Sequence, residues 1–145
     1  MNCPRCNVEL KVEDYKGIEV DRCPSCQGMW LDYGELDELE DKVLDIDEIK
    51  GTMIYKSSQG QLICPVCDKA MQRFDYRFYD LELDFCDEGH GTWLDAGEEK
   101  RVLELMEQRI KDLKRKHKAE AEWGHFIRKL RSPSFFDKLK GLFKK

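Results

Sequence analysis

The sequence contains no run of about 18 apolar residues, which excludes a membrane-spanning helix. Common enzyme patterns are missing too: we find no phosphate-binding loop and no pairing of a nucleophile with a general base. We therefore expect no enzymatic activity. Apolar material is also scarce, because 38% of the 145 residues are charged and 41% are hydrophobic. Such a composition does not predict a large hydrophobic core.

Cysteine is present seven times, an odd number that argues against a framework of disulfides. No apolar targeting segment precedes Cys3, so we expect a reducing, cytoplasmic location. Six of the cysteines form Cys-x-x-Cys pairs, the spacing typical of zinc sites in intracellular proteins. We interpret the thiols as metal ligands.

One stretch of the chain occurs twice, as CPSCQGMWLD at residues 23–32 and as CDEGHGTWLD at residues 86–95. Each copy has an upstream Cys-Pro-x-Cys partner, at residues 3–6 and 64–67. Two closely spaced thiols cannot saturate a metal ion, whereas two such pairs brought together by a β-hairpin can. The repeat therefore predicts two metal-stabilised modules of about 40 residues each, a size that rarely folds without a staple.

Four ligands in each module follow from this pairing. In the second copy no cysteine stands at the place of Cys26, and we predict that His90 replaces it; alternatively, His90 is a turn residue and water completes the site. Thiolate and imidazole favour zinc in a closed tetrahedron, so we predict two structural Zn²⁺ ions, with iron as the alternative in site 1. The predicted ligands are Cys3, Cys6, Cys23 and Cys26 in site 1, and Cys64, Cys67, Cys86 and His90 in site 2.

The segments around the ligands predict the fold. Alternating apolar residues from Val8 onwards indicate a hairpin over residues 8–22, and similar patterns indicate strands at 74–78 and 81–85. Asp32 with Glu35 has the acidic form of a capping box before a helix, and the second copy repeats this pattern. Trp30 is expected to pack over its own hairpin and shield the thiolates. The prediction is a small metal-stabilised α+β fold with two zinc-ribbon-like β-hairpin modules, each followed by a helix, and a long C-terminal helical extension.

Charge and pattern divide the chain into four segments. They are a first module with its helix (1–48), a connector with strand character (49–63), a second module with the start of a long helix (64–113), and a basic helical tail that ends in an amphipathic segment (114–145). Residues 1–107 carry 12 basic and 26 acidic side chains, a net charge of −14. Residues 108–145 carry 13 basic and 4 acidic side chains, a net charge of +9. An acidic metal-binding body therefore precedes a basic tail.

The residues of the repeat resemble a known family. Residues 21–36 (DRCPSCQGMWLDYGEL), preceded by Cys-Pro-x-Cys and a short hairpin, are similar to the transcription factor IIB-type zinc-finger family. The resemblance covers residues 3–40 closely, and residues 64–99 with His90 in place of a cysteine and with a longer hairpin. It implies a zinc-ribbon-like fold and an association with transcription, and it implies no particular biochemical activity.

The function that we favour is a zinc-dependent module that docks a protein partner through exposed aromatic anchors. The candidate anchors are Tyr15, Tyr33, Tyr55, Tyr76 and Phe78. Each module is expected to fold on its own metal ion, so that Cys64→Ser would unfold the second module alone.

Two alternatives remain open. The first is nucleic-acid binding linked to transcription, although the charge of −14 on residues 1–107 repels phosphate; its candidate residues are Lys111, Lys114, Arg115, Lys116 and Lys118. The second is a peripheral adaptor whose segment 134–145 contacts an anionic membrane surface or a partner groove; its apolar face consists of Phe135, Phe136, Leu139, Leu142 and Phe143. That segment has a further interpretation, in which it folds back onto the acidic helices of the protein itself.

Overall fold

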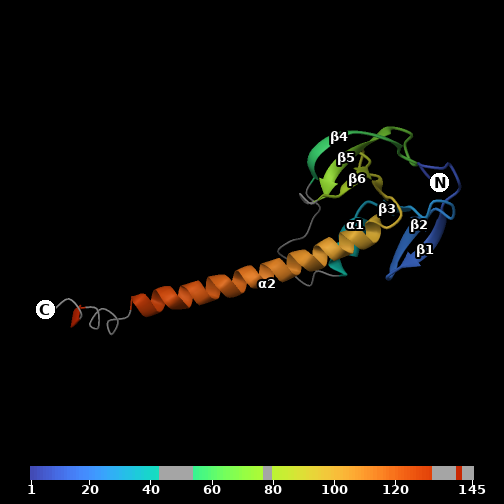
Figure 1. The fold of residues 1–145 in the computed structure, drawn as a ribbon. Coiled ribbons are helices and arrows are strands. Elements are labelled where there is room, and N and C mark those ends of the chain that lie inside the picture. Colours follow the sequence, from blue (N-terminus) through green and yellow to red (C-terminus); the bar gives the residue numbers. More distant parts are fainter. Residues whose placement is uncertain (43–53, 77–79, 132–139, 142–145) are drawn as a thin grey trace. The chain divides into compact units, whose positions relative to one another are not determined.

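The computed structural model describes residues 1–42, 54–76, 80–131 and 140–141, of which residues 54–57 are described by their backbone alone. Within these residues, seven strands form one antiparallel sheet in the order β1-β2-β3-β7-β6-β5-β4 (Figure 1). The strands are β1 (Lys11–Tyr15), β2 (Ile18–Arg22), β3 (Met29–Asp32), β4 (Ile54–Ile63), β5 (Ala70–Tyr76), β6 (Glu82–Phe85) and β7 (Gly91–Leu94), and the helices are α1 (Glu35–Asp41) and α2 (Glu98–Leu130). The chain separates into two compact units, Met1–Glu107 and Gln108–Lys145.

The predicted small α+β fold is confirmed. The first repeat contributes β1, β2, β3 and α1, and the second contributes β4 to β7 and the start of α2. The range that we predicted as a connector contains β4, which pairs with β5 through two irregularities in register. The helix α2 continues without a break across residue 113, where we had placed a segment boundary. No described helix is both long enough and apolar enough to cross a membrane.

The first strand of the first hairpin begins at Lys11, later along the chain than the predicted start at residue 8. Strand β1 begins at Lys11 and lies at the edge of the sheet, so Val8 and Val12 are exposed and only Leu10 of that alternating set is buried. The partner strand β2 has the expected alternation, with Ile18 and Val20 both buried. An edge strand has a neighbour on one side only, and this leaves less cover for its apolar side chains.

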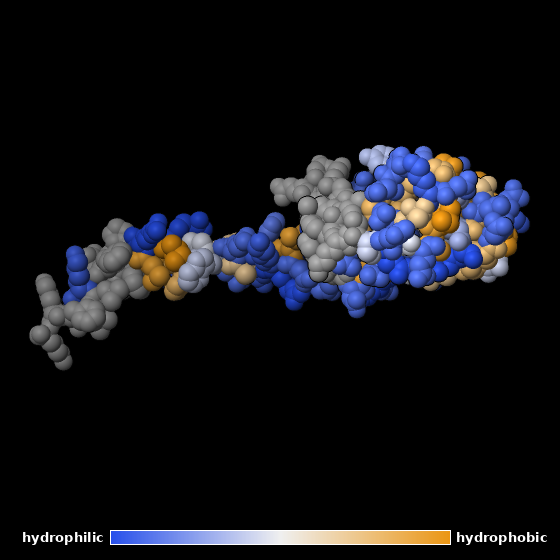
Figure 2. Space-filling view, turned by 90° about the horizontal axis from the view of Figure 1, so that it is seen from above, coloured by the Kyte–Doolittle hydropathy of each residue, from blue (hydrophilic) through white to orange (hydrophobic). Residues whose placement is uncertain are grey.

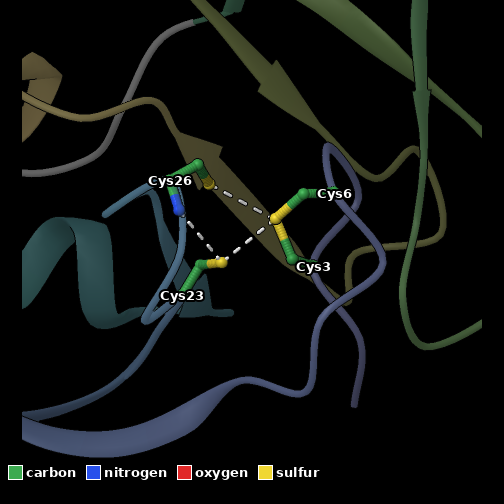
Figure 3. Close-up of side chains that lie close together, drawn as sticks. All are labelled: Cys3, Cys6, Cys23 and Cys26. Carbon is green, nitrogen blue, oxygen red and sulfur yellow. Dashed lines mark hydrogen bonds between the residues drawn. The ribbon is translucent and has the colours of Figure 1, made fainter.

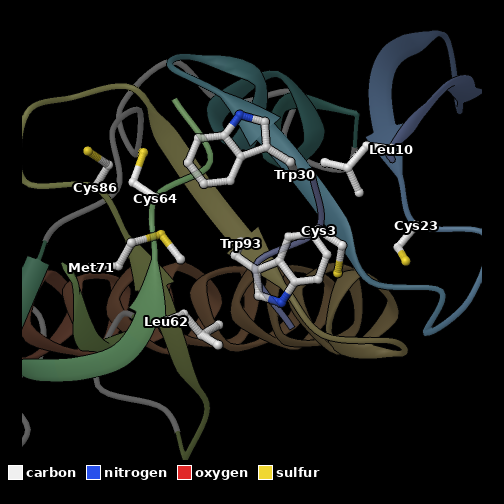
Figure 4. Close-up of a cluster of buried hydrophobic side chains, with 9 residues drawn as sticks. All are labelled: Cys3, Leu10, Cys23, Trp30, Leu62, Cys64, Met71, Cys86 and Trp93. Atoms are coloured by element: carbon white, nitrogen blue, oxygen red, sulfur yellow. The ribbon is translucent and has the colours of Figure 1, made fainter. Parts of the chain in front are cut away.

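The two repeats meet where β3 pairs with β7. In this antiparallel pairing Trp30 lies directly opposite Trp93, and the register continues from Met29 with Leu94 to Asp32 with Gly91. Directly opposite residues point to the same face of a sheet, so both indoles enter one core. Figure 4 shows the two indoles between the buried cysteines of the two repeats. The repeats therefore share one hydrophobic core.

Helix α1 adds a second connection between the repeats. Leu39 and Glu40 are buried residues of this helix. The hydroxyl of Tyr76 on β5 donates a hydrogen bond of 2.5 Å to Glu40 Oε1. A buried carboxylate requires such partners because it has left water. This contact joins a helix of the first repeat to a strand of the second.

Candidate metal centres

Site 1 collects four thiols from two turns. Cys3 and Cys6 precede β1, and Cys23 and Cys26 lie between β2 and β3 (Figure 3). The four Sγ atoms lie within 4.8 Å of one another, with separations of 3.6 Å from Cys3 to Cys26 and 3.3 Å from Cys6 to Cys23. A tetrahedral zinc site with Zn–S bonds of about 2.3 Å places its sulfur atoms about 3.8 Å apart. The separations therefore suit a zinc ion and are too long for disulfide bonds of about 2.05 Å.

Site 2 is built in the same way from three thiols and an imidazole. Cys64 and Cys67 follow β4, and Cys86 and His90 lie between β6 and β7. The Sγ atoms of Cys67 and Cys86 are 3.6 Å apart. His90 presents Nδ1, which lies 3.3 Å from the sulfur of Cys86 and 4.0 Å from that of Cys64. Nδ1 of His90 is thus placed to act as the fourth donor atom.

A shifted turn explains how His90 takes the place of a cysteine. In the first repeat Gln27, just after Cys26, adopts a left-handed conformation with φ of 61°, and its N–H bonds to the carbonyl of Cys23. In the second repeat the left-handed residue comes one position earlier, at Gly89 with φ of 79°, and its N–H closes a tighter turn on Cys86. Glycine adopts this conformation without the steric penalty of a side chain. The loop from Cys86 to Gly91 is as long as the loop from Cys23 to Gly28. His90, the residue after the left-handed Gly89, therefore stands in the position of a ligand.

Backbone N–H groups point at the sulfur atoms within these turns. The N–H of Arg5 lies 3.4 Å from Cys3 Sγ, and the N–H of Val66 lies 3.4 Å from Cys64 Sγ. Hydrogen bonds of this kind favour the charged thiolate over the neutral thiol. The turns therefore supply both the ligands and part of their electrostatic stabilisation.

The thiols of each site have unequal acidities. Burial raises the pKa of Cys3 to about 12 and the pKa of Cys64 to about 11. Burial acts in the same direction on Cys23 and Cys86, but hydrogen bonds from backbone N–H groups and from neighbouring ligands lower their pKa values to about 6 and about 7. A thiol must lose its proton to ligate zinc. Zinc binding therefore releases protons from the thiols with raised pKa values.

The donor sets and their spacing fit zinc in both sites. Four thiolates, or three thiolates with one imidazole, are the ligand sets of closed structural zinc sites. The ligands that the sequence predicted are the residues that the structure brings together. Both clusters are positioned to bind Zn²⁺, which would hold the two turns of each repeat side by side.

Sequence reasoning missed the contact between the repeats that lies next to these sites. A Cβ atom added at Gly28 would come within 2.2 Å of Cζ2 of Trp93, and one added at Gly91 within 2.8 Å of Cζ2 of Trp30. Each tryptophan thus packs against a glycine of the opposite repeat and does not simply cover its own hairpin, as we had expected. The signal was present in the duplicated Gly-x-Trp-Leu-Asp motif, because a residue type required in both copies at one position indicates a close approach.

Each predicted capping box forms only the hydrogen bond from the backbone N–H of the aspartate to the glutamate. The N–H of Asp32 donates to Glu35 at 2.7 Å, as a capping box requires. However, Oδ1 of Asp32 accepts the indole N–H of Trp30 at 2.8 Å, and the N-cap of α1 is Gly34 without a side-chain cap. The second repeat has the same arrangement, with Trp93 donating to Asp95 at 2.9 Å. The aspartates therefore orient the tryptophans.

Asp95 also connects the second repeat to site 1. The guanidinium of Arg5, between the ligands Cys3 and Cys6, donates two hydrogen bonds of 2.5 Å to the carboxylate of Asp95. Paired bonds between arginine and a carboxylate fix geometry better than a single contact. Burial acts to raise the pKa of Asp95, but the bonds from Arg5 and Trp93 outweigh it and lower the pKa.

The other predicted site residues have mixed outcomes. Tyr33 is 85% exposed and Tyr15 is half-buried, whereas Tyr76 is fully buried against Glu40 and cannot serve as an exposed anchor. The Tyr55 side chain and all of Phe78 lie outside the described residues. The five basic residues predicted for nucleic acid are all exposed on α2, and the five apolar residues predicted for the tail lie outside the described residues.

Comparison with known proteins agrees with this geometry. A family model described as "Transcription factor zinc-finger" matches residues 2–42 and 63–105, in two tandem segments. Each matched segment contains one complete set of four ligands. No curated protein matches the chain, and no solved structure matches it.

Proposed function

Because the chain belongs to the transcription factor zinc-finger family, we propose that its two zinc ions are structural and that they support a surface for docking a protein partner. Four protein ligands at each ion fill a tetrahedron and leave no open position for a substrate. The partner, in this proposal, presents a basic segment that carries one large apolar side chain. The observation on which the proposal rests is a groove beside site 2.

The groove lies between the start of α1 and the loop that carries Cys86. It has a volume of about 360 Å³, at the lower end of the range of small-molecule sites. Phe74 and Phe85 contribute apolar walls, with their rings edge to face at 5.2 Å, and the exposed ring of Tyr33 stands at the rim. An aromatic rim over an apolar floor is typical of positions that dominate binding energy.

The charge around the groove selects the partner. The carboxylates of Asp32, Asp37 and Asp87 line it, and the unit that contains it carries a net charge of −14 before any metal is bound. Zinc bound by the three thiolates and the neutral imidazole of site 2 would add further negative charge. Complementary charge speeds association and excludes partners of like sign. We therefore expect lysine or arginine on both sides of the apolar anchor.

Site-specific photo-crosslinking tests the proposal. A photoreactive phenylalanine analogue at Tyr33 should capture a defined protein through a basic segment, and the same analogue at Val12, which is exposed outside the groove, should not. With that protein purified, Tyr33→Ala should weaken binding at least about tenfold, and binding should weaken with added salt. Equal capture at both positions, or a partner whose crosslinked segment is acidic, would contradict the proposal.

Nucleic-acid binding is a second candidate, favoured by one arrangement on α2. Lys111, Lys114, Arg115 and Lys118 follow the spacing of a single helix face, and all four are exposed. Lys116 lies on another side and approaches Glu120 at 3.9 Å. A stripe of this kind can contact successive phosphates.

A salt titration separates this candidate from the first. If the stripe binds nucleic acid, the affinity for random duplex DNA falls steeply with salt, and Lys111→Gln with Lys114→Gln reduces the slope by about two units. Unchanged affinity in that double variant, or no binding at low salt, would exclude the stripe as a nucleic-acid site.

A further inference from the structure

The second unit has an apolar face on the last two turns of α2. Trp123 is 63% exposed and Phe126 is 48% exposed, and their rings lie 5.6 Å apart. Ile127 and Leu130 continue the spacing of three and four residues that places side chains on one side of a helix. Figure 2 shows apolar atoms of this part of α2 directly beside strongly hydrophilic ones. We refer to these four residues as the α2 apolar face.

This exposure contrasts with the other tryptophans of the chain. Trp30 and Trp93 are both fully buried in the shared core. Apolar residues scattered singly over a surface are ordinary, but adjacent large aromatic and aliphatic side chains mark an interaction surface. Tryptophan suits a boundary between an apolar and a polar phase, because its ring is apolar and its N–H needs a polar partner.

The charge around the face is positive. Residues 108–131 contain nine lysines and arginines and three acidic residues, a net charge of +6. Arg128, Lys129 and Arg131 stand within and just after the same two turns. An exposed helix that combines tryptophan, phenylalanine and leucine on one side with lysine and arginine on the other is suited to the interface of a membrane.

We propose that the α2 apolar face binds an anionic lipid surface. The helix lies in the plane of the interface, with Trp123 and Phe126 among the acyl chains nearest the head groups and with Arg128, Lys129 and Arg131 against lipid phosphates. Nucleic acid could make the same phosphate contacts as a lipid surface, but those contacts do not account for the exposed apolar side chains of the face. A second copy of the chain would bring two segments of charge +6 together, which opposes pairing through this face.

Tryptophan fluorescence of the full-length, zinc-loaded protein tests the proposal. Trp123 is the only exposed one of the three tryptophans, so a change in emission on adding vesicles reports on this face. With vesicles containing about one-third phosphatidylglycerol in phosphatidylcholine, we expect a blue shift and quenching by brominated acyl chains. Trp123→Phe is the matched control and should remove both signals while the buried tryptophans continue to emit.

A second variant tests the face without removing the probe. Phe126→Ser should weaken vesicle binding at least about tenfold, with the zinc content and the helical circular dichroism unchanged. Absence of quenching by brominated lipid would overturn the proposal, and so would equal binding to pure phosphatidylcholine vesicles. A blue shift that grows with protein concentration without lipid, or that arises with duplex DNA and not with vesicles, would assign the face to a second copy or to nucleic acid instead.

Discussion

Gly28 lies so close to Trp93 that a Cβ atom added to the glycine would come within 2.2 Å of the ring atom Cζ2. Gly28 follows the site 1 ligands Cys23 and Cys26, whereas Trp93 belongs to the second repeat. The reverse contact joins Gly91 to Trp30 of the first repeat, and Gly91 directly follows the site 2 residue His90. Each metal-binding turn is therefore in contact with the tryptophan of the other repeat.

The first prediction concerns these glycines. Gly28→Ala should destabilise the zinc-loaded protein by about 1–3 kcal/mol, the usual cost of overpacking a core. Gly91→Ala should cost at least as much, because an added Cβ atom would also come within 2.2 Å of the backbone oxygen of Leu31. The measurement is the free energy of unfolding in denaturant, with both zinc ions bound at the start.

Gly124 provides the matched control. It lies inside α2 and an added Cβ atom would meet nothing within 4 Å. Gly124→Ala should leave the stability unchanged or raise it by up to about 1 kcal/mol, because alanine favours a helix interior. Equal effects at Gly28 and Gly124 would show that the indole does not press on the Gly28 turn.

The second prediction concerns the loss of one metal. The sequence suggested independent modules, but the shared sheet and the paired tryptophans lead us to expect that Cys64→Ser weakens zinc binding in site 1 as well. Site 1 contains none of the altered atoms, so any weakening must pass through the contact between the repeats. Alkylation of Cys6 in the presence of zinc measures the effect, because that thiol is exposed. Alkylation of Cys6 at the wild-type rate would show that the two modules bind zinc independently.

The third prediction tests the unusual ligand. His90→Ala removes Nδ1 from site 2, and the zinc affinity of that site should fall by more than the about 10–100-fold that follows loss of a hydrogen-bond partner of a ligand. His90→Cys should restore binding and change the cobalt spectrum of site 2 from that of three sulfurs and one nitrogen toward that of four sulfurs. His117→Ala, in the second unit, is the control. Full affinity in His90→Ala would mean that another group completes the site.

The fourth prediction follows from Glu98. Burial raises its pKa to about 7, although the N–H of Asp95 donates to it at 2.7 Å and opposes that rise. A carboxyl group with a raised pKa in the folded state stabilises the fold below its unfolded pKa of about 4.3, and this contribution is lost as the pH rises through about 7. Glu98→Gln should therefore be more stable than the wild type at about pH 8, and the difference should shrink toward about pH 6.

Glu35 is the counterpart of Glu98 in the first repeat and provides the comparison. Burial also raises the pKa of Glu35, which accepts the N–H of Asp32 at 2.7 Å. Glu35→Gln should act in the same direction with a smaller amplitude. A stability difference for Glu98→Gln that does not change between about pH 6 and about pH 8 would show that Glu98 does not titrate in this range.

The sequence was informative where chemistry restricts residue choice, and less so where packing decides. The spacing of the cysteines, with His90 at the place of the missing thiol, predicted the two clusters of side chains that the structure brings together, because few side chains ligate zinc. The alternation of Ile18 and Val20 predicted β2 correctly, but the same reasoning failed at Val12, since periodicity cannot tell an edge strand from a central one. The strands β3 and β7 were missed, because their pairing joins residues about 60 positions apart and has no local signal.

We infer that two zinc ions together hold one interlocked fold. Native mass spectrometry during zinc titration of the reduced, metal-free protein tests it most directly. We expect the metal-free and two-zinc species to dominate throughout, with little of the one-zinc species, because each site completes the surroundings of the other. A one-zinc species that dominates at one equivalent would show that the two sites fill independently, and saturation at fewer than two zinc ions would show that one of them does not bind zinc.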